Sequence, residues 1–217
     1  MQLWQIKMIN NLFPITKVGF KYITIAFSLF LIFEIFDFDF LAIIAFISLV
    51  AFVYIFRNPE REVPSFLGTS LVSPVDGVIV SINELVDDEY AYAVKIDSNL
   101  MSVGVLRSPM DASVKSVKVF RGTRISKDKA LHEDINEYAQ IEFSDISSNL
   151  VKIVHRLKQS FAPISIDVIP DQNLKQSARY GNVFNGTTTV YIPQNFRLNV
   201  NVGNELKASE SLLGYFS

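Results

Sequence analysis

Two long apolar segments near the N-terminus constrain most strongly what this 217-residue chain can fold into. Eleven of its eighteen phenylalanines lie between Phe13 and Phe56, and residues 18–33 and 40–56 are apolar except for one lysine and a few hydroxyl side chains. As helices, the two segments would each rise about 24–26 Å, against about 30 Å of bilayer hydrocarbon. We therefore predict a membrane-associated, hydrophobic helical hairpin over residues 1–56.

Charged residues around the hairpin predict its orientation. Basic residues lie towards the outer ends and acidic residues in the hinge: Lys7, Lys17, Lys21, Arg57 and Arg61, against Glu34, Asp37 and Asp39. Because cytoplasmic flanks carry the excess of Lys and Arg, both ends are predicted to be cytoplasmic. A cleaved signal peptide and a buried soluble hairpin are weaker alternatives, since a small-residue cleavage site and a polar helix face are both missing. A full span and a shallow re-entrant hairpin both stay open.

After the hairpin the composition changes to alternating, β-branched runs separated by turn residues such as Asp76-Gly77 and Asn185-Gly186. This pattern is typical of strands, and long helical patterns are absent. The predicted strands are 78–85, 91–96, 113–120, 139–143, 150–157, 164–169, 187–192 and 198–202. We therefore predict that residues 57–217 form a mainly β, barrel-sandwich-like domain on the cytoplasmic side of the membrane.

Composition excludes several classes of function. The formal net charge of -2 does not favour a nucleic-acid partner, because such binding depends on neutralising phosphates. The chain has no cysteine, so disulfides, thiolate nucleophiles and cysteine-ligated metals are impossible. With only two histidines, we predict no metal site.

Several short motifs follow one another along almost the whole chain. They are Phe56-Arg57-Asn58-Pro59-Glu60-Arg61, Ser73-Pro74-Val75-Asp76-Gly77, Arg107-Ser108-Pro109-Met110-Asp111-Ala112, Asn136-Glu137-Tyr138, and Arg179-Tyr180-Gly181 with the later Val202-Gly203-Asn204-Glu205-Leu206-Lys207-Ala208. Each motif alone is weak, but their order is specific. The sequence resembles the short, membrane-attached phosphatidylserine decarboxylases and their archaeal-type relatives.

This resemblance implies a self-processing proenzyme, or zymogen, of phospholipid biosynthesis. In the family a serine attacks the carbonyl of the preceding glycine, the resulting ester undergoes elimination, and the new N-terminus becomes a pyruvoyl group. This carbonyl forms a Schiff base with phosphatidylserine and accepts the electrons left by carbon dioxide. The resemblance places the family site at Asp76, Gly104, Gly186 and Thr187, and Thr187 would carry the pyruvoyl-type cofactor.

Two of these positions are substituted. The chain contains no Gly-Ser dipeptide. Counting forward from Gly181 puts Gly186-Thr187 at the cleavage position, where elimination would leave a 2-oxobutanoyl group, and counting back from Pro193 puts Asn185-Gly186 there. Gly104 stands where the family has the histidine that serves proton transfer, and general-base assistance is worth about 10²–10⁴ in rate. Asp76 is retained, although an aspartate before glycine is also typical of a turn. We assign no catalytic role to His132, expected on a solvated surface, or to His155, expected to make a packing or cross-strand contact in a strand.

Three hypotheses follow from the substitutions. The preferred one is a non-processing, degenerate decarboxylase homologue, a pseudoenzyme, which keeps its fold and membrane attachment. It would bind a phosphatidylserine-like phospholipid, with a second copy or an active paralogue as a further partner. The alternative is an active phosphatidylserine decarboxylase that uses Thr187 to make phosphatidylethanolamine. A biotinyl- or lipoyl-like interaction module is weaker, because no Met-Lys pair occurs at a turn of the β-rich part.

Overall fold

The computed structural model describes residues 13–64, 66, 68–85, 89–126, 129 and 131–217. Lys7 and the rest of the predicted hairpin region before Phe13 lie outside the described residues. The chain divides into two compact units, Asn11–Glu60 and Arg61–Ser217 with the first ten residues, and each is described by itself. The fold class is confirmed: an N-terminal pair of apolar helices precedes a mainly β unit.

The first unit is a pair of helices, α2 (Lys17–Ile35) and α3 (Asp39–Ile55), joined by a tight turn. Small side chains let the helices approach each other, since Ala26, Ala42 and Ala45 are buried. Most of the large apolar side chains on both helices are exposed, as expected of helices that face lipid. Among the described helices, α2 alone is long and apolar enough to cross a membrane, while α3 has 17 residues.

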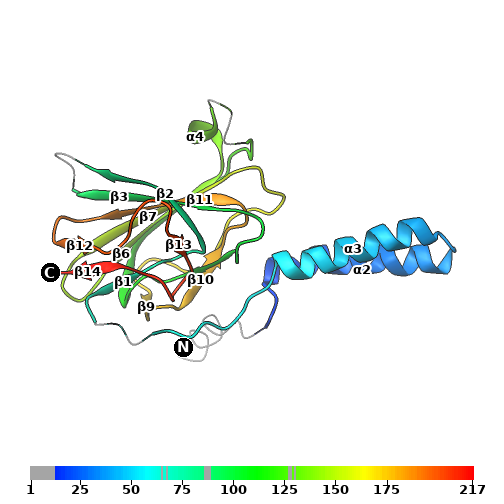
Figure 1. The fold of residues 1–217 in the computed structure, drawn as a ribbon, viewed down its shortest axis with the longest axis horizontal. Helices are drawn as coiled ribbons and strands as arrows, with labels where there is room; N and C mark the ends of the chain where they lie inside the picture. Colours follow the sequence, from blue (N-terminus) through cyan, green and yellow to red (C-terminus); the bar gives the residue numbers. More distant parts are fainter. Residues whose placement is uncertain (1–12, 65, 67, 86–88, 127–128, 130) are drawn as a thin grey trace. The chain divides into compact units, whose positions relative to one another are not determined.

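The described strands of the second unit pair into three antiparallel sheets, and Figure 1 shows their arrangement. Its strands are β1 (Ser70–Val72), β2 (Gly77–Glu84), β3 (Tyr92–Ser98), β4 (Val105–Arg107), β5 (Ala112–Phe120), β6 (Tyr138–Ser144), β7 (Leu150–Leu157), β8 (Ser165–Ile166), β9 (Asn173–Leu174), β10 (Arg179–Asn182), β11 (Gly186–Ile192), β12 (Phe196–Leu198), β13 (Glu205–Leu206) and β14 (Leu212–Phe216). The largest sheet has the order β13-β2-β3-β11-β7-β6-β5-β9, and the smaller sheets are β1-β14-β12 and β4-β10-β8. A four-residue helix, α4 (His132–Ile135), lies between β5 and β6 in the sequence.

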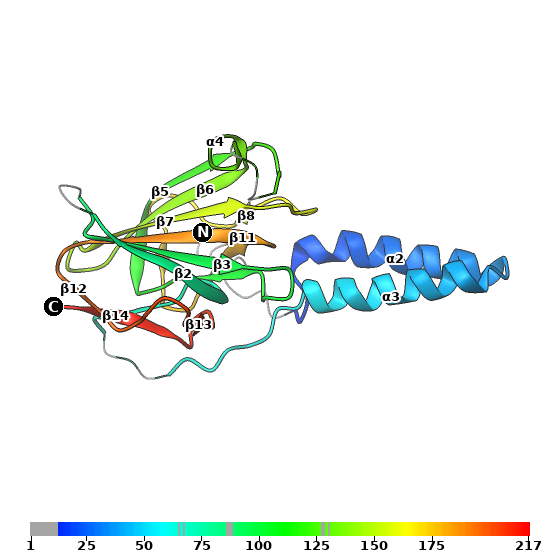
Figure 2. The ribbon, with the colours of Figure 1, turned by 45° about the horizontal axis from the view of Figure 1, so that its top comes forward.

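Alternation along the strands places the core on one face of the large sheet. In β7, Val151, Ile153, His155 and Leu157 are buried, and the residues between them are partly exposed. Successive side chains of a strand point to opposite faces, so this pattern gives the large sheet a buried inner face and an outer face. Figure 2 shows the central strands β3, β11, β7 and β6 side by side. The outer face of these strands carries the candidate site.

Two predicted strands differ from the structure. The strand predicted at 198–202 is wrong, because β12 ends at Leu198, and the one predicted at 164–169 is reduced to the two residues of β8. Short strands such as β1 and β14 pair over long sequence separations, for example Leu71 with Gly214. Such pairs are stabilised by partners that no local pattern reveals.

Candidate functional site

The Gly186–Thr187 bond lies at the start of β11, in the middle of the large sheet. Thr187 pairs with Asp97 of β3 on one side and with Arg156 of β7 on the other. A Cβ atom on Gly186 would lie 2.7 Å from the carbonyl oxygen of Arg156, so glycine is the residue that fits this close approach. The preceding Asn185 has a φ of 62°, which completes the turn into the strand. The candidate bond is therefore fixed by the sheet on both sides.

Gly104 lies beside the turn that leads to this bond. Its carbonyl oxygen accepts a hydrogen bond from the Val183 N–H at 2.7 Å. A Cβ atom on Gly104 would lie 2.4 Å from Cδ1 of Phe184, whose side chain is 1% exposed. The ring of Phe184 thus occupies the space that a larger side chain at position 104 would need, and an imidazole there requires Phe184 to move.

Asp76 serves as a junction between three segments that are distant in the sequence. Its Oδ2 atom is 2.6 Å from a guanidinium nitrogen of Arg61, and its Oδ1 atom accepts the Ala208 N–H at 2.8 Å. Its carbonyl oxygen accepts a hydrogen bond from the Ser98 hydroxyl at 2.5 Å, and Ser98 pairs with Gly186. The backbone of Asp76 is therefore linked to the candidate bond through Ser98, while its carboxylate is bound by Arg61 and the Ala208 N–H.

An ion pair on the outer face was not found by sequence reasoning. Nζ of Lys158 is 2.6 Å from Oδ1 of Asp97, and the two side chains are 9% and 24% exposed. Since Asp97 is the cross-strand partner of Thr187, their Cβ atoms lie about 4.5–5.5 Å apart on the same face. Within the described part of the chain, no hydrogen bond joins the Thr187 hydroxyl to an acid or a base. Strand alternation predicts only the face on which a side chain lies. The pairing of β3 with β11, which brings Asp97 beside Thr187, has no local signature in the sequence.

His155 lies on the inner face, opposite to Thr187. Its Nδ1 atom is 2.8 Å from the hydroxyl of Thr188, and its Nε2 atom is 2.7 Å from the hydroxyl of Tyr180. Complete burial lowers the pKa of His155 to about 3 and raises the pKa of Tyr180 well above its ordinary value. The predicted cross-strand contact is confirmed, since His155 and Thr188 are register partners. Because neighbouring residues of β11 point to opposite faces, His155 is not placed to act on Thr187.

The second histidine, in α4, does not have the environment expected from the sequence. We expected His132 to be solvated, but it is 5% exposed, so this expectation is wrong. Burial lowers its pKa, and the positive charge of Arg156 adds to the effect. Its Nε2 atom is buried and has no hydrogen-bond partner in the structure described here. Among the described residues, no group of three His, Asp or Glu side chains could hold a metal ion.

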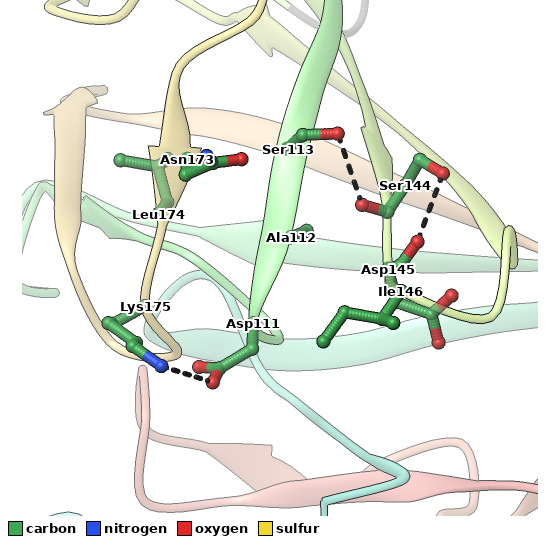
Figure 3. A pocket seen from close by; sticks show the side chains of 9 residues that line it. All are labelled: Asp111, Ala112, Ser113, Ser144, Asp145, Ile146, Asn173, Leu174 and Lys175. Carbon is green, nitrogen blue, oxygen red and sulfur yellow. Dashed lines mark hydrogen bonds and ion pairs between the residues drawn. The ribbon is translucent and has the colours of Figure 1, made fainter.

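A surface cavity of about 410 Å³ lies at the other end of the same strands. Its lining includes Asp111, which directly precedes β5, and Ser144 at the end of β6 (Figure 3). Burial by itself raises the pKa of Asp111, but hydrogen bonds from the Gln176 N–H and from Lys175 lower it below its ordinary value. The two ends of β6, Tyr138 in the row of Thr187 and Ser144 at the cavity, are six residue steps or about 20 Å apart, so this cavity is separate from the Gly186–Thr187 bond.

Comparisons with known proteins agree with the motifs. A family model described as phosphatidylserine decarboxylase matches residues 49–214. A phosphatidylserine decarboxylase proenzyme of Desulfotalea psychrophila is 26% identical over 212 residues, covering 95% of this chain and 99% of the relative. The proenzyme of Ehrlichia chaffeensis is 28% identical, covering 81% of this chain and 80% of the relative. That of Burkholderia mallei is 30% identical, covering 76% and 78%, respectively.

Proposed function

Because the chain belongs to the phosphatidylserine decarboxylase family, we propose that it works in phospholipid metabolism at a membrane without converting itself into the pyruvoyl form. The observation that carries this proposal is the packing of Phe184 against Gly104, in the space that an imidazole would need. The position of the missing base therefore offers no free space beside the candidate bond, because the ring of Phe184 fills it.

The chemistry of the Thr187 hydroxyl supports the same conclusion. A hydroxyl attacks a peptide carbonyl efficiently only when a base accepts its proton. In the described part of the chain His155 is on the opposite face of the sheet, and the carboxylate of Asp76 is bound by Arg61. When formed, the pyruvoyl-type group would supply the electron sink for decarboxylation. Without processing, Thr187 stays an ordinary residue of β11.

The alternative, an active enzyme that processes itself at Gly186–Thr187, has one observation in its favour. Asp97 and its partner Lys158 lie on the same face as Thr187 and could take the role of the missing base. In that reaction Oγ1 of Thr187 attacks the Gly186 carbonyl carbon, and the amide nitrogen leaves and is protonated. Elimination then removes the Cα proton of Thr187, breaks the Cβ–Oγ1 bond and frees the Gly186 carboxylate. The resulting enamine tautomerises to an imine, and water hydrolyses the imine to ammonia and a 2-oxobutanoyl group. This is the second candidate because the carboxylate of Asp97 is already paired with Lys158, and no hydrogen bond joins it to the Thr187 hydroxyl in the described part of the chain.

For the preferred function, residues 1–56 form the membrane anchor and residues 57–217 the lipid-binding part on the cytoplasmic side. The proposed ligand is a phospholipid with a phosphatidylserine-like headgroup, and a second copy or an active paralogue is the proposed protein partner. The exposed apolar side chains of α2 and α3 support membrane attachment. Carbonate extraction of membranes should leave the full-length chain in the pellet, and a soluble full-length chain would contradict the anchor.

A decarboxylation assay tests the enzymatic part. We expect no release of labelled carbon dioxide when the full-length chain is mixed with phosphatidylserine labelled in the serine carboxyl group. A catalytically active family member in the same micelles is the positive control. Carbon dioxide release that Thr187→Ala abolishes would overturn the proposal and establish the alternative.

A further inference from the structure

One row of paired residues joins the candidate bond to the free edge of β5. The partners, in order across β3, β11, β7, β6 and β5, are Asp97, Thr187, Arg156, Tyr138 and Phe120. Since neighbouring strands lie about 4.8 Å apart, Phe120 is about 14 Å from Thr187. Side chains of one row share a face of the sheet, so all five lie on the outer face.

Side-chain contacts continue along this row. The guanidinium carbon of Arg156 lies 5.0 Å from the centre of the Tyr138 ring. The Tyr138 ring is stacked with that of Phe120, with 5.3 Å between their centres. Arg156 also donates a hydrogen bond to the carbonyl oxygen of Glu133 in α4. The surface near Thr187 is therefore continuous with the end of β5 and with α4.

Large apolar side chains are exposed at this end of the sheet. Val119 and Phe120 are 39% and 45% exposed, and Leu131 and Ile135, beside and within α4, are 58% and 36% exposed. The two segments are in contact, because a Cβ atom on Gly122 would lie 2.2 Å from the Ile135 carbonyl oxygen and 2.9 Å from the Phe120 ring. We call Val119, Phe120, Leu131 and Ile135 the β5 tip.

Basic residues outnumber acidic residues along the β5 tip in a chain of net charge -2. Residues 115–137 contain six Lys or Arg residues and four Asp or Glu residues, of which Glu133 and Asp134 lie in α4. Lys118 is exposed, and the side chain of Arg121 is 61% exposed although it forms an ion pair with the buried Glu137. Lysine on a free strand edge also prevents edge-to-edge association. That role explains Lys118 but not the exposed phenylalanine and valine that follow it.

We infer that the β5 tip seats on the surface of an anionic phospholipid bilayer. Apolar side chains with basic neighbours suit the boundary between headgroups and acyl chains. There the apolar side chains are buried among the acyl chains, and the basic side chains meet lipid phosphates. The occupant is a lipid surface because the same chain carries an apolar helical hairpin. This docking rests on the proposed membrane attachment and adds a second contact, made by the β unit. It brings the outer face around Thr187 to within about three strand spacings of the lipid.

Tryptophan fluorescence of the full-length chain in vesicles tests this docking. The protein has one tryptophan, Trp4, so Trp4→Phe provides a background without tryptophan. Phe120→Trp places a probe at the β5 tip, and Ile146→Trp places a matched probe at the opposite end of the strands, where the native side chain is 100% exposed. In vesicles containing phosphatidylglycerol, we expect the emission of the Phe120→Trp protein to shift to the blue and to be quenched by brominated lipid. The Ile146→Trp protein should keep the emission of a water-exposed indole.

A double variant tests the contribution of the basic side chains to the docking. Lys115→Gln with Lys118→Gln, added to the Phe120→Trp protein, should weaken the quenching in vesicles that contain phosphatidylglycerol. Unchanged quenching would overturn the assignment to an anionic surface. Equal quenching of the probes at positions 120 and 146, or no quenching at position 120 in protein that sediments with the vesicles, would overturn the docking itself. Failure to sediment with vesicles would instead overturn the membrane attachment on which the docking rests.

Discussion

The buried imidazole of His155 predicts a specific loss of stability in acid. The pKa of His155 is about 3 in the folded chain, because burial disfavours its charged form, against 6.5 for an ordinary histidine. The unfolded chain therefore binds one more proton between these values. The contribution of neutral His155 to the free energy of unfolding is fully present above pH 6.5 and is lost as the pH falls from 6.5 to 3. The loss begins near pH 6.5 and amounts to about 1.4 kcal/mol per pH unit below that value. His155 therefore lowers the free energy of unfolding by about 2 kcal/mol between pH 7 and pH 5.

Urea unfolding of the full-length chain in detergent micelles, followed by near-ultraviolet circular dichroism, measures this loss. His155→Gln keeps a side chain that can hydrogen-bond to Thr188 or Tyr180 but cannot titrate. We expect the variant to lose about 2 kcal/mol less than the wild type between pH 7 and pH 5. His132→Gln is measured separately, because burial also lowers the pKa of His132 and its replacement should likewise reduce the loss in acid. If the wild type and His155→Gln lost the same free energy, the burial argument would be refuted.

Three further predictions concern the candidate site. Gly104→Ala should lower the free energy of unfolding by about 1–3 kcal/mol, seen as a lower urea midpoint, because its Cβ meets Phe184; an unchanged midpoint would show that the site is not tightly packed. The double variant Thr187→Ser with Gly104→His should stay intact by mass spectrometry. The triple variant that also contains Phe184→Ala should show some cleavage. Cleavage of the double variant would show that Phe184 does not block the imidazole. Arg61→Gln should lower the free energy of unfolding by about 1.5–3 kcal/mol, seen as a lower urea midpoint, because it removes a charged hydrogen bond to Asp76; an unchanged midpoint would show that this ion pair does not stabilise the fold.

Local patterns predicted the parts of the fold that depend on neighbouring residues. The hairpin followed from the two apolar segments, and the predicted bounds of β7 agree with the structure, because its side chains alternate between the two faces. The short strands β1, β10 and β14 were not predicted. Each has five residues or fewer and depends on partners far away in the sequence.

The candidate site was only partly predictable for the same reason. Motif order placed Gly186 and Thr187 in the chain, but their neighbours depend on how β11 is inserted between β3 and β7. The Asp97–Lys158 ion pair comes from this insertion and joins residues 61 positions apart. The burial of His132 was missed because its charged sequence neighbours suggested a solvated surface, whereas the side chain is buried near Arg156 and the Leu157 backbone at the end of β7.

The intact mass of the purified, full-length chain tests the central claim most directly. An unprocessed protein gives one species at 24.5 kDa with Gly186 still joined to Thr187. Storage at neutral pH should not change this mass, because among the residues that the structure describes no base is hydrogen-bonded to the hydroxyl of Thr187, and the nearby Asp97 is paired with Lys158. Two fragments divided between these residues, the second beginning with a 2-oxobutanoyl group, would contradict the account.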